Sequence, residues 1–146
     1  MFRTGNSPAL LFIRLALGTV MFAHGAQKAF GWYGGPGFQK TIEMFSALGF
    51  APWMTLVLMF IELFGSLELI FGLLTRLSAL GITITISTCA YMNHIQNGFF
   101  MNWFGNQAGE GVEYHLLVIG ITLALMISGG GLLSVDRVIY IARKKS

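Results

Sequence analysis

The stretch from His24 to Gly37 reads His-Gly-Ala-Gln-Lys-Ala-Phe-Gly-Trp-Tyr-Gly-Gly-Pro-Gly, and the rest of the chain is organised around it. It begins inside an apolar run and ends in a turn rich in glycine and aromatic residues. Histidine, glutamine and lysine are costly to place near the end of a membrane helix, and such residues mark functional sites there. The stretch therefore predicts a site at the boundary between membrane and water.

The composition indicates an integral membrane protein with a single domain, residues 1–146. The chain is 55% hydrophobic and 10% charged, with a mean hydropathy of +0.70, whereas soluble domains carry roughly 25% charged residues. Its one cysteine, Cys89, lies in an apolar run, and a single cysteine excludes a disulfide within the chain. We therefore expect a buried, inert thiol at this position.

Four apolar runs predict an all-α integral membrane fold, a bundle of four transmembrane helices. The expected spans, each long enough to cross a hydrocarbon layer of about 30 Å, are residues 8–31, 53–74, 77–97 and 112–133. Between the first two spans, apolar residues recur at helical spacing from Phe38 to Gly49, opposite polar ones. This pattern predicts a short amphipathic helix on the membrane surface. Residues 134–146 are expected to form a basic tail.

The basic residues predict the orientation of the bundle. Four spans place both termini on one side, and the basic residues expected on that side are Arg3, Arg76, Arg137, Arg143, Lys144 and Lys145. Only Lys28 and Lys40 fall on the opposite side. By the positive-inside rule, both termini are expected to be cytoplasmic in a multi-pass topology.

One face of the first span carries Arg14, Gly18, Met21 and Gly25, which follow steps of four, three and four residues. Small residues on such a face allow a neighbouring helix to approach closely. Arg14 and Glu68 are both expected about 9 Å inside the cytoplasmic boundary, at about 1.5 Å per residue. Because an unpaired charge at that depth is costly, we predict a structural ion pair between Arg14 and Glu68.

Glu62 lies near the middle of the second span, with no basic residue at the same depth. Two states remain open for it. Either the carboxyl group is protonated and hydrogen-bonded to a neighbouring helix, or it reaches toward His24 or Lys28 in the outer half. A carboxyl group beside a histidine can transfer protons, so the candidates for proton handling are His24, Glu62, His94 and Glu113.

A polar cluster is expected at the outer ends of spans one, three and four. Its predicted ligand-binding residues are His24, Gln27, Lys28, His94, Asn97 and Glu113. His115 is near the same cluster, but it lies two residues from Glu113, about 200° around a helix, so only one of the two is expected to face inward. No tight motif such as His-x-x-x-His is present, so no metal site is predicted. A polar pocket for a quinone-like head group fits this set of residues better.

The loop after the third span offers aromatic side chains near this cluster, namely Phe99, Phe100, Trp103 and Phe104. They would either cover a flat quinone ring or anchor the loop at the membrane interface. Interfacial anchoring is the usual role of such residues in membrane proteins.

Motifs along most of the chain resemble the DoxX family of small bacterial membrane proteins, and the run from His24 to Gly37 is the most specific of them. The other matching features are Arg14 with Gly18 and Phe22, Glu62, Glu68, Gly72-Leu73-Leu74-Thr75-Arg76, Asn97-Gly98-Phe99-Phe100, Glu113, Gly129-Gly130 and Ser134-Val135-Asp136. The resemblance implies a four-helix protein of the bacterial cytoplasmic (inner) membrane. By its name, the family is linked to a membrane subunit associated with thiosulfate:quinone oxidoreductase. The resemblance supplies no set of catalytic residues that can be assigned to positions of this chain.

The resulting hypothesis is a redox-linked membrane component that binds a quinone-like molecule at the outer interface and works with a partner oxidoreductase. The chain shows no haem, flavin or iron–sulfur motif, so the sequence leaves open whether it is itself an enzyme. Two alternatives are a proton-coupled small-solute transporter, with Glu62 and Glu68 along its path, and a non-catalytic membrane anchor for another enzyme. A homo-oligomer in the lipid bilayer is compatible with so small a bundle, and no nucleic acid partner is expected.

Overall fold

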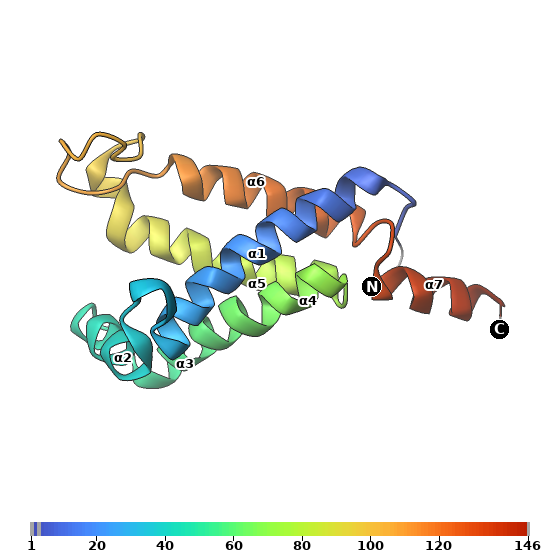
Figure 1. The fold of residues 1–146 in the computed structure, drawn as a ribbon, viewed down its shortest axis with the longest axis horizontal. Coiled ribbons are helices and arrows are strands. Elements are labelled where there is room, and N and C mark those ends of the chain that lie inside the picture. The colour runs from blue at the N-terminus through green and yellow to red at the C-terminus, as the bar shows by residue number, and fades with distance from the viewer. Residues whose placement is uncertain (1, 3, 146) are drawn as a thin grey trace.

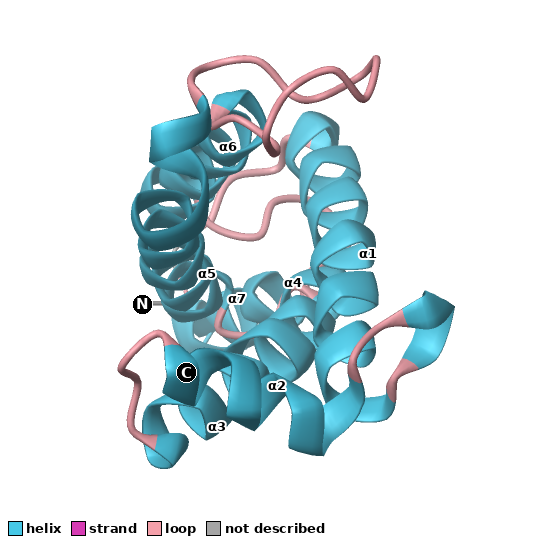
Figure 2. Ribbon diagram, turned by 90° about the vertical axis from the view of Figure 1, so that its left-hand side faces the viewer, coloured by secondary structure: helices cyan, strands magenta, loops and turns pink. Residues whose placement is uncertain are grey.

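The fold is taken from a computed structural model, which describes Phe2 and residues 4–145. Arg3, one of the basic residues used above to orient the chain, lies outside this part. Within the described residues the chain forms helices and loops and no strand (Figure 2). The predicted all-helical class is therefore confirmed.

Four helical rods run side by side in an elongated bundle (Figures 1 and 2). The first rod is α1 (Pro8–Phe30) and the fourth is α6 (Glu113–Ser128). The second rod consists of α3 (Pro52–Phe60), a π-helical turn (Ile61–Gly65) and α4 (Ser66–Phe71). The third consists of α5 (Thr75–Cys89), a π-helical turn (Ala90–His94) and a 3-10 turn (Ile95–Asn97).

Two of the rods are long and apolar enough to cross a membrane. They are α1, with 23 residues, and the 20-residue rod from Pro52 to Phe71. α6 is apolar but shorter, because it ends at Ser128 and not near residue 133 as expected. Gly129 and Gly131 follow with φ of 78° and 72°, a left-handed backbone that ends a helix.

Short helices follow the first and fourth rods at the two ends of the bundle. A 3-10 turn (Trp32–Gly34) and α2 (Gly37–Ala47) follow α1, so the helix expected between the first two spans is present. The Thr41 hydroxyl donates to the Lys28 carbonyl oxygen at 3.2 Å and ties α2 to the end of α1. At the other end, the expected basic tail forms a further helix, α7 (Val135–Lys145), which projects from the bundle (Figure 1).

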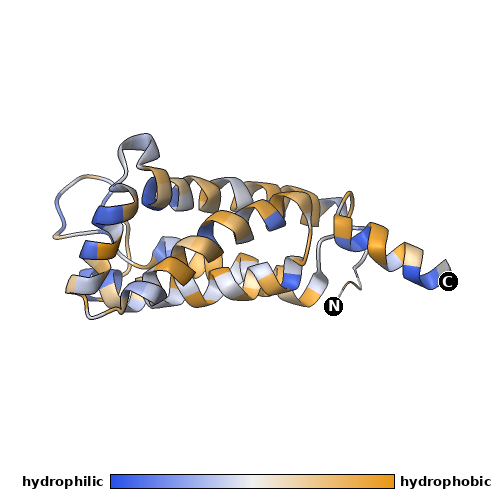
Figure 3. Ribbon diagram, turned by 90° about the horizontal axis from the view of Figure 1, so that it is seen from below, coloured by the Kyte–Doolittle hydropathy of each residue, from blue (hydrophilic) through white to orange (hydrophobic). Residues whose placement is uncertain are grey.

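Both ends of the chain lie at the same end of the bundle. The Gly131 amide donates to the Thr4 hydroxyl at 2.6 Å, and Arg137 donates to the Asn6 side chain. We call the opposite end, which carries α2 and the loop of residues 98–112, the distal end. Hydrophilic residues gather toward the two ends, whereas apolar residues predominate along the helices between them (Figure 3).

The predicted stripe of small residues brings α1 against the second rod. Gly18 and Gly25 are buried with Met21, and a Cβ at Gly25 would lie 2.8 Å from the Leu63 amide nitrogen. A Cβ at Gly18 would lie 2.9 Å from the Ser66 carbonyl oxygen. The two backbones therefore approach as closely as the glycines permit, as in membrane helix pairs with small residues at the contact.

Arg14 does not pair with Glu68, so this predicted ion pair is wrong. The Arg14 side chain is 1% exposed and donates to carbonyl oxygens at the end of α4 and in the loop after α6. Its acceptors are Leu69 (3.1 Å), Ile70, Gly130 (3.0 Å), Leu132 (3.3 Å) and Leu133 (2.6 Å). Glu68 instead accepts a hydrogen bond from Ser78. The reason is that the last carbonyls of a helix lack partners within it, and a guanidinium has five donors to offer them.

Asp136 accepts hydrogen bonds from free amides at the start of α5, just as Arg14 donates to carbonyls at the end of α4. Its two carboxylate oxygens accept from the Leu74 and Thr75 amides at 2.8 and 2.9 Å, and the residue is 2% exposed. A carboxylate at a helix N-terminus satisfies free amides and interacts favourably with the helix dipole. The segment after α6 is therefore fixed to α5 as well as to α1.

We expect Arg14→Lys to lower the free energy of unfolding by about 2–4 kcal/mol, because an ammonium has three donors and several buried carbonyls would lose their partners. The measurement is thermal or denaturant unfolding in mild detergent, followed by helical circular dichroism. Arg143→Lys, at an exposed position of α7, is the matched control. Equal stability of both variants and the unmodified protein would contradict the role assigned to Arg14.

Candidate functional site

A pocket of about 320 Å³ opens at the distal end of the bundle, between α1, the second and third rods, and α6. Its polar lining residues are His24, Lys28, Glu62, His94, Glu110 and His115. The lining is completed by Ile86, Cys89, Met101 and Tyr114. A concave, mostly apolar space with a few convergent polar groups is the usual form of a small-molecule site.

An ion pair forms one wall of the pocket. Lys28 Nζ of α1 lies 2.6 Å from Glu62 Oε2, and the two side chains are 20% and 3% exposed. Of the two states left open for Glu62, the structure has the one in which the carboxylate reaches across to Lys28. Because an isolated charge is costly in an apolar bundle, each partner is retained by the other.

Each of the two π-helical turns contributes to the pocket. The turn Ile61–Gly65 contains Glu62, and the turn Ala90–His94 contains His94. A π turn widens the helix by one residue, so the side chains that follow are rotated relative to an α-helix, and such turns occur often at functional sites. Both π-helical turns are therefore found where the rods line the pocket.

The histidines converge on the pocket from three rods. The ring centroids of His94 and His115 are 4.3 Å apart, and those of His24 and Tyr114 are 6.0 Å apart. His115 is 4% exposed and faces inward. Glu113 does not line the pocket, so only one of these two residues faces inward, as expected.

Three predicted ligand-binding residues lie outside the pocket. Glu113 Oε1 accepts from the Met101 amide and from Trp103 Nε1, each at 3.1 Å, and so orders the loop of residues 98–112. Asn97 Nδ2 donates to the Glu110 carbonyl oxygen at 3.1 Å in the same loop. Gln27 packs against Gly35, since a Cβ added to Gly35 would lie 2.5 Å from the Cβ of Gln27.

The aromatic side chains of the distal loop also lie outside the pocket. Phe99, Phe100, Trp103 and Phe104 are 50%, 65%, 79% and 89% exposed, and none of them lines the space. This exposure fits anchoring at an interface, while Phe99 and Trp103 also line a neighbouring hollow of about 540 Å³ with Glu113, so the ring-covering role stays a prediction. Met101 of the same loop lines the pocket instead.

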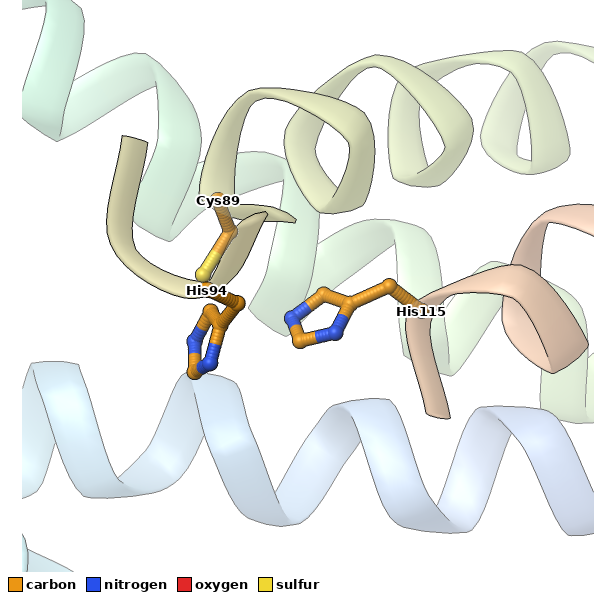
Figure 4. Close-up of side chains that lie close together, drawn as sticks. All are labelled: Cys89, His94 and His115. Carbon is orange, nitrogen blue, oxygen red and sulfur yellow. The ribbon is translucent and has the colours of Figure 1, made fainter. Parts of the chain in front are cut away.

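Cys89 is one of the lining residues that the sequence pattern failed to indicate, together with Glu110 and Met101. It is half-buried, and its Sγ lies with ring nitrogens of His94 and His115 in a group whose atoms are all within 4.8 Å of one another. Figure 4 shows the three side chains converging, two from the end of the third rod and one from the start of α6. A cysteine and a histidine five residues apart would fall on different faces of an α-helix, so the spacing gave no signal.

Comparison with known proteins gives a consistent family. A family model described as DoxX matches residues 9–95, which include His24, Lys28, Glu62, Cys89 and His94. The chain is 33% identical over 140 residues to a protein of Haemophilus influenzae named "Uncharacterized protein", covering 92% of this chain and 85% of the relative. It is 25% identical over 134 residues to "Putative oxidoreductase CatD" of Bacillus subtilis, covering 92% and 89%. No solved structure matches the chain.

The Lys28–Glu62 pair can be tested with a double-mutant cycle of Lys28→Met, Glu62→Gln and the combined variant. Each single change leaves a buried polar or charged group without its partner, whereas the double change removes both charges. We expect the double variant to be more stable than the sum of the single effects predicts, by about 1–3 kcal/mol.

The measurement is denaturant unfolding in detergent at constant pH. Lys40→Met and Glu43→Gln, at exposed positions of α2, provide the control cycle, for which effects within about 0.5 kcal/mol are expected. Additive single effects at Lys28 and Glu62 would show that the two side chains are not coupled.

Proposed function

The chain belongs to the DoxX family of membrane proteins, and from this premise we propose that it binds a quinone-like head group in the distal pocket and works with a partner oxidoreductase. The observation that carries this proposal is the pocket itself, where Lys28, Glu62 and three histidines meet beside apolar side chains. The oxidoreductase name of one relative is consistent with it.

The chemistry of the lining suits a quinone. Carbonyl oxygens of the ring accept hydrogen bonds, and Lys28 and His24 of the pocket offer donors. Reduction of a quinone consumes protons together with electrons, and Glu62 beside Lys28, with His24 in the same pocket, offers groups that exchange protons. The partner oxidoreductase would supply or accept the electrons, and this chain would bind the ring and deliver the protons.

We further propose that the four rods span the bacterial inner membrane with both termini in the cytoplasm. Each rod carries large apolar side chains on its outer surface, such as Phe12 (69% exposed), Phe64 (47%), Ile84 (57%) and Leu117 (68%). Soluble proteins rarely expose continuous apolar surfaces of this kind, whereas lipid covers them in a membrane. The described basic residues Arg76, Arg137, Arg143 and Lys144 belong to the segments near the chain termini, as the positive-inside rule requires of a cytoplasmic side.

The topology is tested by labelling single cysteines placed in a Cys89→Ser background. Gln107→Cys lies in the exposed distal loop and Lys144→Cys in α7. With a membrane-impermeant maleimide on spheroplasts, we expect labelling of the first variant only, and labelling of both after lysis. Labelling of Lys144→Cys on intact spheroplasts would contradict the proposed orientation.

Quinone binding is tested with a photoreactive short-chain ubiquinone analogue on the purified protein in nanodiscs. We expect cross-links within residues 24–28, 86–94 or 113–118, and loss of cross-linking when unmodified quinone competes. Lys28→Met and His24→Gln are expected to weaken binding by about 10-fold or more, because a hydrogen bond to a charged group contributes about 1.5–3 kcal/mol.

Lys40→Met, at an exposed lysine of α2 on the same side of the bundle, should leave the affinity unchanged. Thermal unfolding of each variant shows whether it is folded, and His24→Gln removes a ring without breaking the ion pair. Cross-links confined to α7 or to the outer surface of the rods, or equal affinity of all variants, would overturn the proposal.

A further inference from the structure

Cys89, His94 and His115 form a compact group of three side chains that ligate metals. The Sγ of Cys89 and one nitrogen of each ring all lie within 4.8 Å of one another. The group draws on two rods that are distant in sequence, since His115 comes from α6 and the other two from the end of the third rod (Figure 4). None of the three side chains takes part in the Lys28–Glu62 ion pair.

The π-helical turn explains why Cys89 and His94 meet. Residues five apart on an α-helix are about 140° apart around the axis, at about 100° per residue. The turn Ala90–His94 has the wider i to i+5 hydrogen-bonding pattern, which brings residues five apart close to one line along the helix. A metal-ligating pair therefore arises at a spacing that is not a metal motif in a regular helix.

His94 is held in an orientation that suits a ligand. Its Nδ1 lies 2.9 Å from the Glu110 carbonyl oxygen, so an Nδ1–H donor leaves the lone pair on Nε2. Histidine ligands almost always donate their other ring nitrogen to a carbonyl, a carboxylate or water in this way, which fixes the tautomer and makes the ligand more basic.

His115 completes the group from the start of α6. The residue is 4% exposed, and its Nδ1 is buried without a hydrogen-bond partner among the described residues. The other ring nitrogen, Nε2, points toward Cys89 and His94 (Figure 4) and is the ligand atom that this ring offers to the group. It lies in the pocket that also contains Cys89 and His94.

We propose that Cys89, His94 and His115 bind one thiophilic transition-metal ion, copper or zinc, in the distal pocket. A thiolate with two imidazoles suits both ions. Bonds of about 2.0–2.3 Å place neighbouring ligand atoms about 3.4–3.7 Å apart, so the three side chains need to close by only about 1 Å. The Met101 thioether lines the same pocket, and a thioether is a ligand for copper.

The electrostatic surroundings permit a cation at this place. Lys28 is the lysine that lines the pocket, and Glu62 offsets its charge at 2.6 Å. The thiolate of Cys89 supplies a negative charge directly to the ion. The proposal departs from the expectation of an inert thiol and of no metal site, which rested on the absence of a sequence-local motif.

The test is metal binding by the full chain purified in mild detergent. The isolated protein is analysed by inductively coupled plasma mass spectrometry, stripped with a chelator, and titrated with Cu(I) under reductant or with Zn(II) against a chromophoric competitor. We expect one equivalent to bind, and the tighter ion in competition identifies the metal. With Co(II) as a probe, we expect a thiolate-to-cobalt charge-transfer band in the near ultraviolet.

Loss of an outer-shell partner weakens metal binding by about 10–100-fold, and we expect Cys89→Ser and His115→Gln each to weaken it by more than that. Cys89→Ser should also abolish the charge-transfer band. Ser87→Ala, at an exposed position of the same rod, should bind as the unmodified chain does. His24→Gln should keep the metal, because His24 is not in the group of three. Thermal unfolding confirms that each variant is folded.

The metal site and quinone binding are tested separately. Metal bound without a quinone would support the metal site and defeat the proposed function, and quinone bound without a metal would do the reverse. Metal that binds equally to Cys89→Ser and to the unmodified chain, with no charge-transfer band, would be adventitious and would overturn the site.

Discussion

The ion pair between Lys28 and Glu62 is the interaction on which the distal pocket depends. A lysine near the end of one apolar helix and a glutamate inside another are each costly alone, and at 2.6 Å each satisfies the other. The pair fixes the separation of α1 and the second rod at the level where the pocket opens. At the other end of the bundle, Arg14 satisfies carbonyls of α4 and of the loop after α6. The two groups together hold α1 in place at both ends, and the buried glycines between them permit close backbone contact.

The π-helical turns connect this packing to chemistry. A regular α-helix through residues 52–71 or 75–97 would present its polar residues in different directions from those observed. The turn at Ile61–Gly65 accompanies the inward placement of Glu62, and the turn at Ala90–His94 brings His94 into line with Cys89. Such turns persist where the surrounding contacts or the function compensate for their poorer hydrogen bonding. Here both occur in the wall of one pocket, which is a physical reason to regard that pocket as the functional part of the molecule.

Hydrophobic periodicity was sufficient to predict the helical class, the helix between the first two spans, and the buried face of α1 with Gly18, Met21 and Gly25. It also placed His24, Lys28 and His94 near one another, because residues at the same ends of packed helices meet. It failed for Arg14, since depth along a helix says nothing about which carbonyls are free, and the carbonyls proved better acceptors than Glu68. It did not indicate that Gln27, Asn97 and Glu113 lie beside loops outside this pocket, or that Cys89 lines it, because a π turn leaves no pattern in the sequence. Which of Glu113 and His115 faces the pocket depends on how α6 is rotated about its axis, and only the packing of the bundle determines that rotation.

The central claim is that the distal pocket of this DoxX-family protein holds a quinone-like molecule in the membrane. The measurement that tests it most directly is native mass spectrometry of the protein released from mild detergent, with the lipid-soluble molecules that dissociate from it identified by their masses. The account predicts one quinone per chain, retained when bulk phospholipid is removed. A folded chain that carries phospholipid alone, across preparations from quinone-rich membranes, would contradict it.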